Sequence, residues 1–387
     1  MKNCKELLAE NLAWVEETFA KIDKKMQTVT VKNRDRLVEG TDAEGKKRRT
    51  IGATNWVAGF WGGLNLLMYT QTKNEEYLTT AKRSEELLDE GLMTMEKLHH
   101  DVGFMWHIVS GGLYNLTGDE NSKRRNLLAA ATLSSRYVLN GHFIRAWNGT
   151  WNGLDTYNFT IIDCMMNIPQ LYWASRVTGD DRFKQIAMSH ADTAMKGHIR
   201  PDGSVAHIVE HDRELGEPVK TYGGQGYAEG SSWSRGQSWA VYGFVLSYIH
   251  TGEVRYLDAA KRVAHYFIAN CCDDWIPRID FRAPSEPVYH DVTAGCCTAC
   301  GLIEIAKAVG ENEGGMYMNA AINLLKAIEA KYADYSLDTE YILKGGSTSY
   351  PKDESLAAAR VNLPIIYGDY YFVEALTKLL GNEFLPW

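Results

Sequence analysis

The hexapeptide Thr178-Gly179-Asp180-Asp181-Arg182-Phe183 separates two apolar segments, and it recurs as Thr251-Gly252-Glu253-Val254-Arg255-Tyr256. A glycine in the left-handed conformation ends a helix, and an acidic residue after it caps or begins the next helix. The motif therefore predicts a tight helix-turn-helix connection. One shorter and two looser copies extend the series: Thr117-Gly118-Asp119, Thr72-Lys73-Asn74-Glu75-Glu76-Tyr77 and Val309-Gly310-Glu311.

Apolar residues at helical period flank each of these turns. The segments before the turns are 56–69, 105–116, 161–177, 239–249 and 292–308, and those after them are 77–88, 127–138, 183–195, 256–268 and 316–328. Together with 7–22 and 365–380 they predict about twelve helices, the first in an outer layer and the last in an inner one.

Helix pairs of this kind bury a continuous core only when they stack on their neighbours. The spacing between the turns is uneven because long connections separate the pairs, and this favours a closed ring over an open solenoid. We therefore predict an all-α fold, an (α/α)6 barrel, as one catalytic domain over residues 1–387.

Composition limits the partners. The net charge is −8 and no basic block occurs, which argues against a nucleic-acid partner. No apolar run is long enough to predict a membrane span, and the N-terminal stretch does not read as a secretory signal. The seven cysteines, which include Cys271-Cys272, Cys296, Cys297 and Cys300, are then expected to be reduced thiols in a cytoplasmic protein.

Two carboxylates in the long connections are candidates for chemistry. Asp101 and Asp163 are each predicted at or just before the start of an inner helix, where both would face a funnel formed by the connections. The alternative for each is a helix cap without a chemical role.

Four tryptophans, Trp56, Trp147, Trp233 and Trp239, also fall near the starts of inner helices. A tryptophan is more often a core residue than a sugar platform, but four in equivalent places favour a sugar pocket. Arg235 is a candidate clamp for a substrate carboxylate because its guanidinium suits bidentate pairing. The alternative for Arg235 is a structural ion pair.

Metal ligands are not expected. His207 and His211 lie in a stretch that reads as a loop, and consecutive residues such as His99, His100 and Asp101 should point in different directions. The cysteines near residue 300 lack a second paired set. No cofactor is predicted.

Three motifs carry a resemblance to a known family: His100-Asp101-Val102-Gly103-Phe104, Ile162-Asp163-Cys164-Met165-Met166-Asn167 and Ser232-Trp233-Ser234-Arg235-Gly236-Gln237. They resemble the unsaturated glucuronyl hydrolases of glycoside hydrolase family 88, and the similarity runs from about residue 50 to 375. The resemblance implies an (α/α)6 barrel that removes the unsaturated uronic acid left by polysaccharide lyases. It implies that Asp163 is the general acid and base, that Asp101 assists it, and that further residues line the pocket: Trp56, His100, Trp147, His207, Gln225, Trp233, Arg235 and Trp239.

On this hypothesis Asp163 protonates C4 of the substrate's vinyl ether and then activates the water that adds at C5. The expected partner is an unsaturated uronyl oligosaccharide. Three alternatives remain: a hydrolase of unsaturated galacturonyl-rhamnose from pectin, a sugar epimerase or isomerase on the same barrel, and a carbohydrate-binding scaffold. The segment 345–352 leaves the preference for sulfated sugars open, and the sequence gives no oligomeric state.

Overall fold

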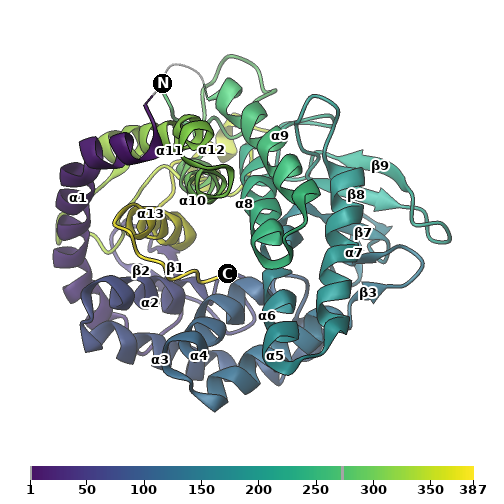
Figure 1. Ribbon diagram of the computed structural model, residues 1–387, viewed down its shortest axis with the longest axis horizontal. Coiled ribbons are helices and arrows are strands. Elements are labelled where there is room, and N and C mark those ends of the chain that lie inside the picture. Colours follow the sequence, from purple (N-terminus) through teal and green to yellow (C-terminus); the bar gives the residue numbers. More distant parts are fainter. Residues whose placement is uncertain (1, 272–273) are drawn as a thin grey trace.

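Two concentric layers of helices form a closed ring in the computed structural model, which describes residues 2–271 and 274–387 (Figure 1). The inner layer comprises α2 (Phe60–Thr72), η2 (Gly103–Gly111) continued by α4 (Gly112–Thr117), η3 (Ile162–Met166) leading to α6 (Pro169–Thr178), α8 (Ser234–Thr251), α10 (Val292–Val309) and α13 (Ile366–Leu379). The outer layer comprises α1 (Cys4–Lys32), α3 (Glu75–Leu92), α5 (Glu120–Ser134), α7 (Asp181–His198), α9 (Val254–Asn270) and α11 (Glu311–Tyr332).

The inner helices contact one another in chain order, and α13 contacts α2 to close the ring. Every residue of α13 is buried, whereas the outer helices bury one face and expose the other. Burial on all sides is what a helix enclosed by other helices requires. This closed double ring confirms the predicted all-α (α/α)6 barrel.

The tight turns form largely as the glycine pattern predicts. Gly118, Gly179 and Gly252 adopt left-handed conformations at φ 72°, 72° and 75°. Asp119 and Asp180 then accept backbone hydrogen bonds as N-caps of the next helices, α5 and α7. Glu253 makes no such side-chain bond, although α9 begins directly after it.

The looser copies of the turn differ in detail. Lys73 takes the left-handed position at φ 59° without a glycine, and the Asn74 side chain caps α3. Gly310 combines φ 87° with an extended ψ of 171°, so α10 ends there in a different conformation.

Short strands, which the sequence pattern did not reveal, stiffen the connections. Three hairpins pair β1 (Val38–Thr41) with β2 (Arg48–Thr50), β3 (Tyr137–Val138) with β4 (Phe143–Ile144), and β5 (Thr150–Trp151) with β6 (Leu154–Asp155). An antiparallel sheet orders β7 (Phe159–Ile161), β8 (Ile208–His211) and β9 (Pro218–Tyr222). Three further short helices, η1 (Met95–Lys97), η4 (Glu354–Leu356) and α12 (Ala357–Arg360), lie in other connections.

The helix α10 is long and apolar enough, by length and composition alone, to cross a membrane. However, 83% of that stretch is buried, because α10 packs between α8 and α13 in the inner layer. Burial in the barrel therefore accounts for its apolar sequence.

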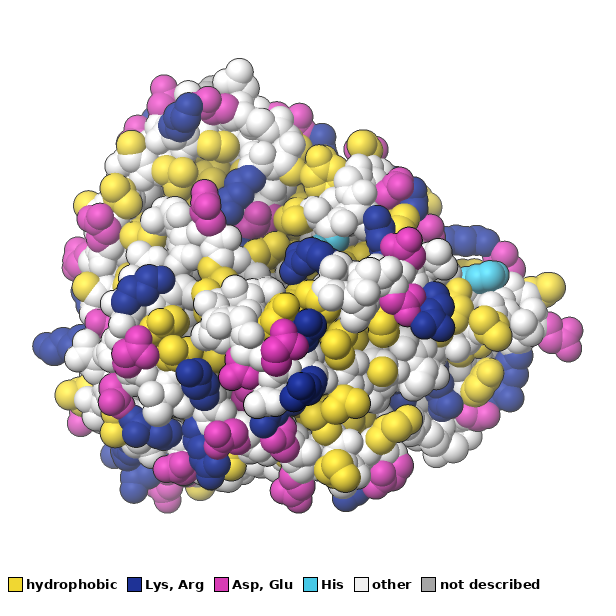
Figure 2. Space-filling view, turned by 60° about the horizontal axis from the view of Figure 1, so that its bottom comes forward, with side chains coloured by type: hydrophobic (Ala, Val, Ile, Leu, Met, Phe, Trp, Pro, Cys, Tyr) yellow, Lys and Arg dark blue, Asp and Glu magenta, His cyan; other side chains and the backbone are white. Residues whose placement is uncertain are grey.

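The thiols of Cys4, Cys164, Cys296, Cys297 and Cys300 are free, in line with the expected reduced state. Cys272 lies outside the described residues. The face of the molecule in Figure 2 carries Lys and Arg interspersed with Asp and Glu, so charges of both signs share that surface.

Candidate active site

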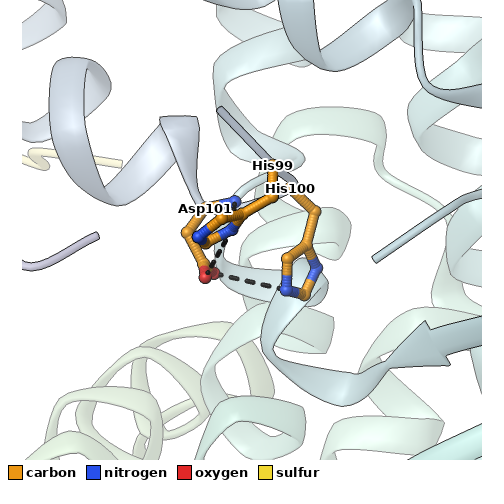
Figure 3. A group of neighbouring side chains, drawn as sticks. All are labelled: His99, His100 and Asp101. Atoms are coloured by element: carbon orange, nitrogen blue, oxygen red, sulfur yellow. Dashed lines mark hydrogen bonds and ion pairs between the residues drawn. The ribbon is translucent and has the colours of Figure 1, made fainter. Parts of the chain in front are cut away.

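The carboxylate of Asp101 lies between two imidazoles (Figure 3). His99 Nδ1 is 3.1 Å from Asp101 Oδ2, and His100 Nε2 is 3.5 Å from Oδ1. The expectation that these consecutive side chains point in different directions was therefore wrong. The expectation assumed helix geometry, whereas His99 lies in an irregular connection and His100 and Asp101 form the turn before η2. In this backbone path both rings face one carboxylate.

This environment favours the anionic form of Asp101. Burial alone raises the pKa of a carboxyl group, but the two imidazoles and a hydrogen bond from Asn167 hold the pKa of Asp101 below its usual value. Burial also lowers the pKa of His100 to about 4, against the opposing influence of Asp101. At neutral pH the site thus contains an aspartate anion beside a neutral imidazole.

Asp163 lies in η3, directly after strand β7. Its Oδ2 atom is buried and has no hydrogen-bond partner among the described residues. His207 Nε2 lies 3.5 Å from that oxygen. Because His207 Nδ1 accepts a hydrogen bond from the backbone N–H of Gln225 at 3.0 Å, the ring hydrogen of neutral His207 sits on Nε2 and faces Asp163.

The amide of Asn167 connects the two aspartates. Asn167 Nδ2 donates to Asp101 Oδ1 at 3.2 Å and to the backbone carbonyl of Asp163 at 3.1 Å, while its Oδ1 accepts from the N–H of Phe104. Asn167 belongs to the motif around Asp163, but the sequence predicts no role for it. Its position four residues after Asp163, one helical turn away, was the available signal.

Arg235 is buried and already paired. Its guanidinium forms an ion pair with buried Asp291 and donates to the carbonyl oxygens of Ser347 at 2.6 Å and Thr348 at 3.1 Å. Asp291 raises the pKa of Arg235 in spite of burial. The structural ion pair is thus present, and the role of Arg235 as a substrate clamp stays a prediction.

The four tryptophans fall into two groups. Trp56 and Trp147 are partly exposed, with Trp147 beside Trp151 at a ring-centroid distance of 5.6 Å. Trp233 and Trp239 are buried, and the Trp233 ring lies 4.3 Å from that of His207. The second pair therefore supports the site residues from within the core.

A cavity of about 360 Å³ opens next to His207. It is lined by residues from three parts of the chain: Trp147 and Trp151; Ile208, Gly224 and Gln225; and Ser349, Tyr350, Lys352, Leu356 and Arg360. Neither aspartate lines this cavity, but His207 does and it faces Asp163. A ligand in the cavity would thus lie one side chain away from Asp163.

A model of Glycosyl Hydrolase Family 88 matches residues 21–280. The chain belongs to glycoside hydrolase family 88. It is 34% identical over 338 residues to the unsaturated glucuronyl hydrolase of Bacillus sp. (strain GL1), covering 84% of this chain and 86% of the relative. It is 32% identical to an unsaturated chondroitin disaccharide hydrolase of Streptococcus pneumoniae, covering 86% of this chain and 84% of the relative.

Solved structures agree with this family-88 assignment. The crystal structure of the Bacillus sp. GL1 unsaturated glucuronyl hydrolase superposes with a TM-score of 0.87 at 32% identity, covering 94% of this chain and 96% of that one. An unsaturated glucuronyl hydrolase specific for heparin gives a TM-score of 0.87 at 26% identity, covering 95% and 97%. The predicted family and the glycosidase class are therefore confirmed.

In this family-88 enzyme, three segments meet at the site: the turn before η2, η3 with the residue after it, and the residue before β8. They bring together five predicted or newly found site residues: His100, Asp101, Asp163, Asn167 and His207. Gln225 joins them through the backbone bond to His207. Trp56 has no contact with these residues among those described above, and its ring packs against that of Tyr367 at a centroid distance of 4.9 Å. The individual roles assigned to these residues from the sequence remain predictions.

Proposed function

We propose that this protein hydrates the C4=C5 double bond of an unsaturated glucuronic acid at the end of a glycosaminoglycan-type disaccharide, and so releases the second sugar. The relatives from Bacillus and Streptococcus carry names that correspond to this reaction. The observation that supports it most directly is the unpartnered Asp163 Oδ2, which faces the Nε2–H of His207.

In the proposed reaction Asp163 transfers a proton to C4, and positive charge develops at C5 and the ring oxygen. A water molecule adds at C5 and returns one proton to Asp163, which restores the acid. The resulting hemiketal opens to a ketone, and the hemiacetal left at C1 then releases the second sugar as an alcohol. An ordinary glycosidase would instead protonate the glycosidic oxygen and attack the anomeric carbon.

Asp101 contributes a fixed negative charge close to this centre. As an anion held by Asn167, it stabilises the cationic character of the transition state and orients its neighbours without itself transferring a proton. The neutral ring of His100 lies beside Asp101 and forms part of its buried polar surroundings.

The cavity wall also supports a preference for an acidic second sugar. Lys352 is exposed at the wall, and Arg360 donates to the Ser349 hydroxyl at 2.7 Å. Cations placed in this way favour a sugar that carries a sulfate group. A Streptococcus agalactiae relative, 26% identical to this chain, has been solved with dGlcA-GalNAc6S.

The test is to mix the protein with unsaturated chondroitin, hyaluronan and heparin disaccharides, each with and without sulfate, and to follow the ultraviolet absorbance of the double bond. Loss of absorbance together with release of the free amino sugar is the expected result. An epimerase or isomerase would leave the glycosidic bond intact, and a binding scaffold would leave the absorbance unchanged. Normal turnover by Asp163→Asn would overturn the proposed mechanism.

We also propose that the enzyme acts in the cytoplasm. The free thiols of Cys164, Cys296, Cys297 and Cys300 support this location, because disulfides are rare in reducing compartments. Fractionation of the source cells with a specific antibody would test it, and recovery in the periplasm or medium would contradict it.

A further inference from the structure

His99 is the one member of the triplet in Figure 3 to which the family resemblance gives no role. Its ring is partly exposed, at 27% of the side chain, and it borders a second hollow that Lys97, Trp147 and Trp151 also line. Its other edge lies against the catalytic centre, since Nδ1 is 3.1 Å from Asp101 Oδ2. One ring thus touches both the accessible surface and a buried carboxylate.

The two oxygens of Asp101 are held differently. Asn167 Nδ2 donates to Oδ1, and His100 Nε2 also approaches Oδ1. Among the side chains of the described residues, the close contact to Oδ2 comes from His99. The backbone N–H of Asp101 also points to His99 Nδ1, but across 3.5 Å, and the shorter contact with a charged oxygen assigns the ring hydrogen to Nδ1. Rotation of the carboxylate about its χ2 angle is therefore restrained on one side by two groups and on the other by His99.

We propose that His99 is a positioning residue, which donates from Nδ1 to Asp101 Oδ2 and so fixes the orientation and the charge of the Asp101 carboxylate during hydration. This inference rests on the proposed function. His99 itself does not reach the reacting atoms, and its effect passes through Asp101.

The other groups that face Asp101 set the background for this effect. His100 lies on the same turn, and Asp163, Cys164 and Asn167 come from η3 and the residue after it. Arg136, just after α5, favours the anion and stays cationic, although burial lowers its pKa to about 10. His100 is neutral above about pH 4, and its Nε2 lies 3.5 Å from Oδ1, longer than an ordinary hydrogen bond, so the close donors to the carboxylate are His99 and Asn167.

A pair of nearly isosteric variants separates the hydrogen bond from the bulk of the ring. His99→Leu removes the donor, whereas His99→Asn retains an N–H close to the position of Nδ1. The matched control is His265→Leu, which removes the contact of His265 Nε2 with the Tyr317 hydroxyl in the outer layer. Thermal unfolding of all three establishes that they are folded.

The first measurement is the pH profile of kcat and of kcat/KM on an unsaturated disaccharide. For His99→Leu we expect kcat to fall about tenfold with KM little changed, since the loss lies in the placement of a catalytic group. We expect the acidic limb to move up by roughly one pH unit, the order of effect of one hydrogen bond to a charged group. His99→Asn should recover most of both, and His265→Leu should match the wild type.

The second measurement does not need activity. Carboxyl-carbon NMR of the chain labelled with ¹³C-aspartate, with the Asp101 signal assigned by Asp101→Asn, follows the titration of Asp101 directly. An upward shift of its midpoint in His99→Leu, reversed in His99→Asn, supports the inference even if the wild type turns over none of the substrates, in which case only the proposed function fails. A midpoint that is the same in His99→Leu and the wild type overturns it.

Discussion

His207 Nε2 lies 3.5 Å from Asp163 Oδ2, and the backbone N–H of Gln225 occupies the other ring nitrogen of His207. This arrangement leaves a single ring hydrogen directed at the carboxylate. A separation of 3.5 Å is longer than an ordinary hydrogen bond, so Asp163 Oδ2 remains available to hydrogen-bond with a substrate atom or a water molecule.

The variant His207→Phe tests this relationship. Phenylalanine preserves the ring that packs on Trp233 but removes both nitrogens. We expect kcat to fall by about 10- to 100-fold, because a group that assists proton transfer is lost. Steady-state kinetics measure the effect, and an unchanged kcat would show that His207 only fills space.

The variant Gly103→Ala tests the Asn167 bridge from the other side. A Cβ at Gly103 would lie 2.7 Å from the Cα and 2.8 Å from the carbonyl oxygen of Asn167, so backbone must move. We expect kcat to fall about tenfold or more, because Asn167 shifts relative to both aspartates. Gly52→Ala is the control, since no atom lies within 4 Å of a Cβ there. Equal activity of the two variants would contradict the proposed importance of the bridge.

Buried neutral histidines predict a loss of stability in mild acid. Burial lowers the pKa of His107 to about 3, while in the unfolded chain it titrates near its ordinary value of about 6.5. The unfolded state therefore binds a proton first as pH falls below that value, and the contribution is fully present only above it. The loss from His107 alone is about 2 kcal/mol between pH 6.5 and 5.

Urea unfolding at several pH values measures this loss. His107→Gln should show a shallower decline of unfolding free energy between pH 6.5 and 5 than the wild type. The exposed His142, which lies in a left-handed turn, provides the control variant His142→Asn. Parallel declines in the wild type and His107→Gln would contradict the prediction.

The end of α13 contains a buried ion network. Lys378 Nζ lies 2.7 Å from Glu304 Oε1 and 3.4 Å from Glu374 Oε1, and all three side chains are buried. Lys378→Met leaves Glu374 without a cation and Glu304 with Lys307 alone, which we expect to destabilise the fold by about 3–5 kcal/mol. Calorimetry or urea unfolding measures this, and the exposed Lys21→Met should change stability by less than about 0.5 kcal/mol.

The ring itself was predictable from local signals. Gly118, Gly179 and Gly252 mark helix ends in the sequence because glycine is the residue that most readily adopts the left-handed conformation. Lys73 adopts the same conformation, but a lysine gives no such signal. The strands of two to five residues in the connections are too short for an alternating pattern to emerge from the sequence. Their pairing depends on contacts between distant segments.

The candidate site was predictable as a set of residues but not as an arrangement. The sequence located Asp101 and Asp163 at the starts of inner helices, and both are there. It did not reveal that His99 turns back onto Asp101, because that depends on the backbone path of a turn. Nor did it decide between a clamp and an ion pair for Arg235, since Asp291 is 56 residues away in the chain.

The pairing of β7 with β8 has a consequence for how this enzyme tolerates change. Ile161 pairs with Ile208, and the N–H of Ile162 bonds to the carbonyl of His207 at 3.1 Å, so Asp163 and His207 extend from the same end of one strand pair. The distance between Asp163 and His207 is thus set by the pairing register of β7 with β8. A residue inserted in the turn between β8 and β9 leaves this register unchanged. A residue inserted within β8 would shift the register by one and turn the His207 side chain to the opposite face of the sheet.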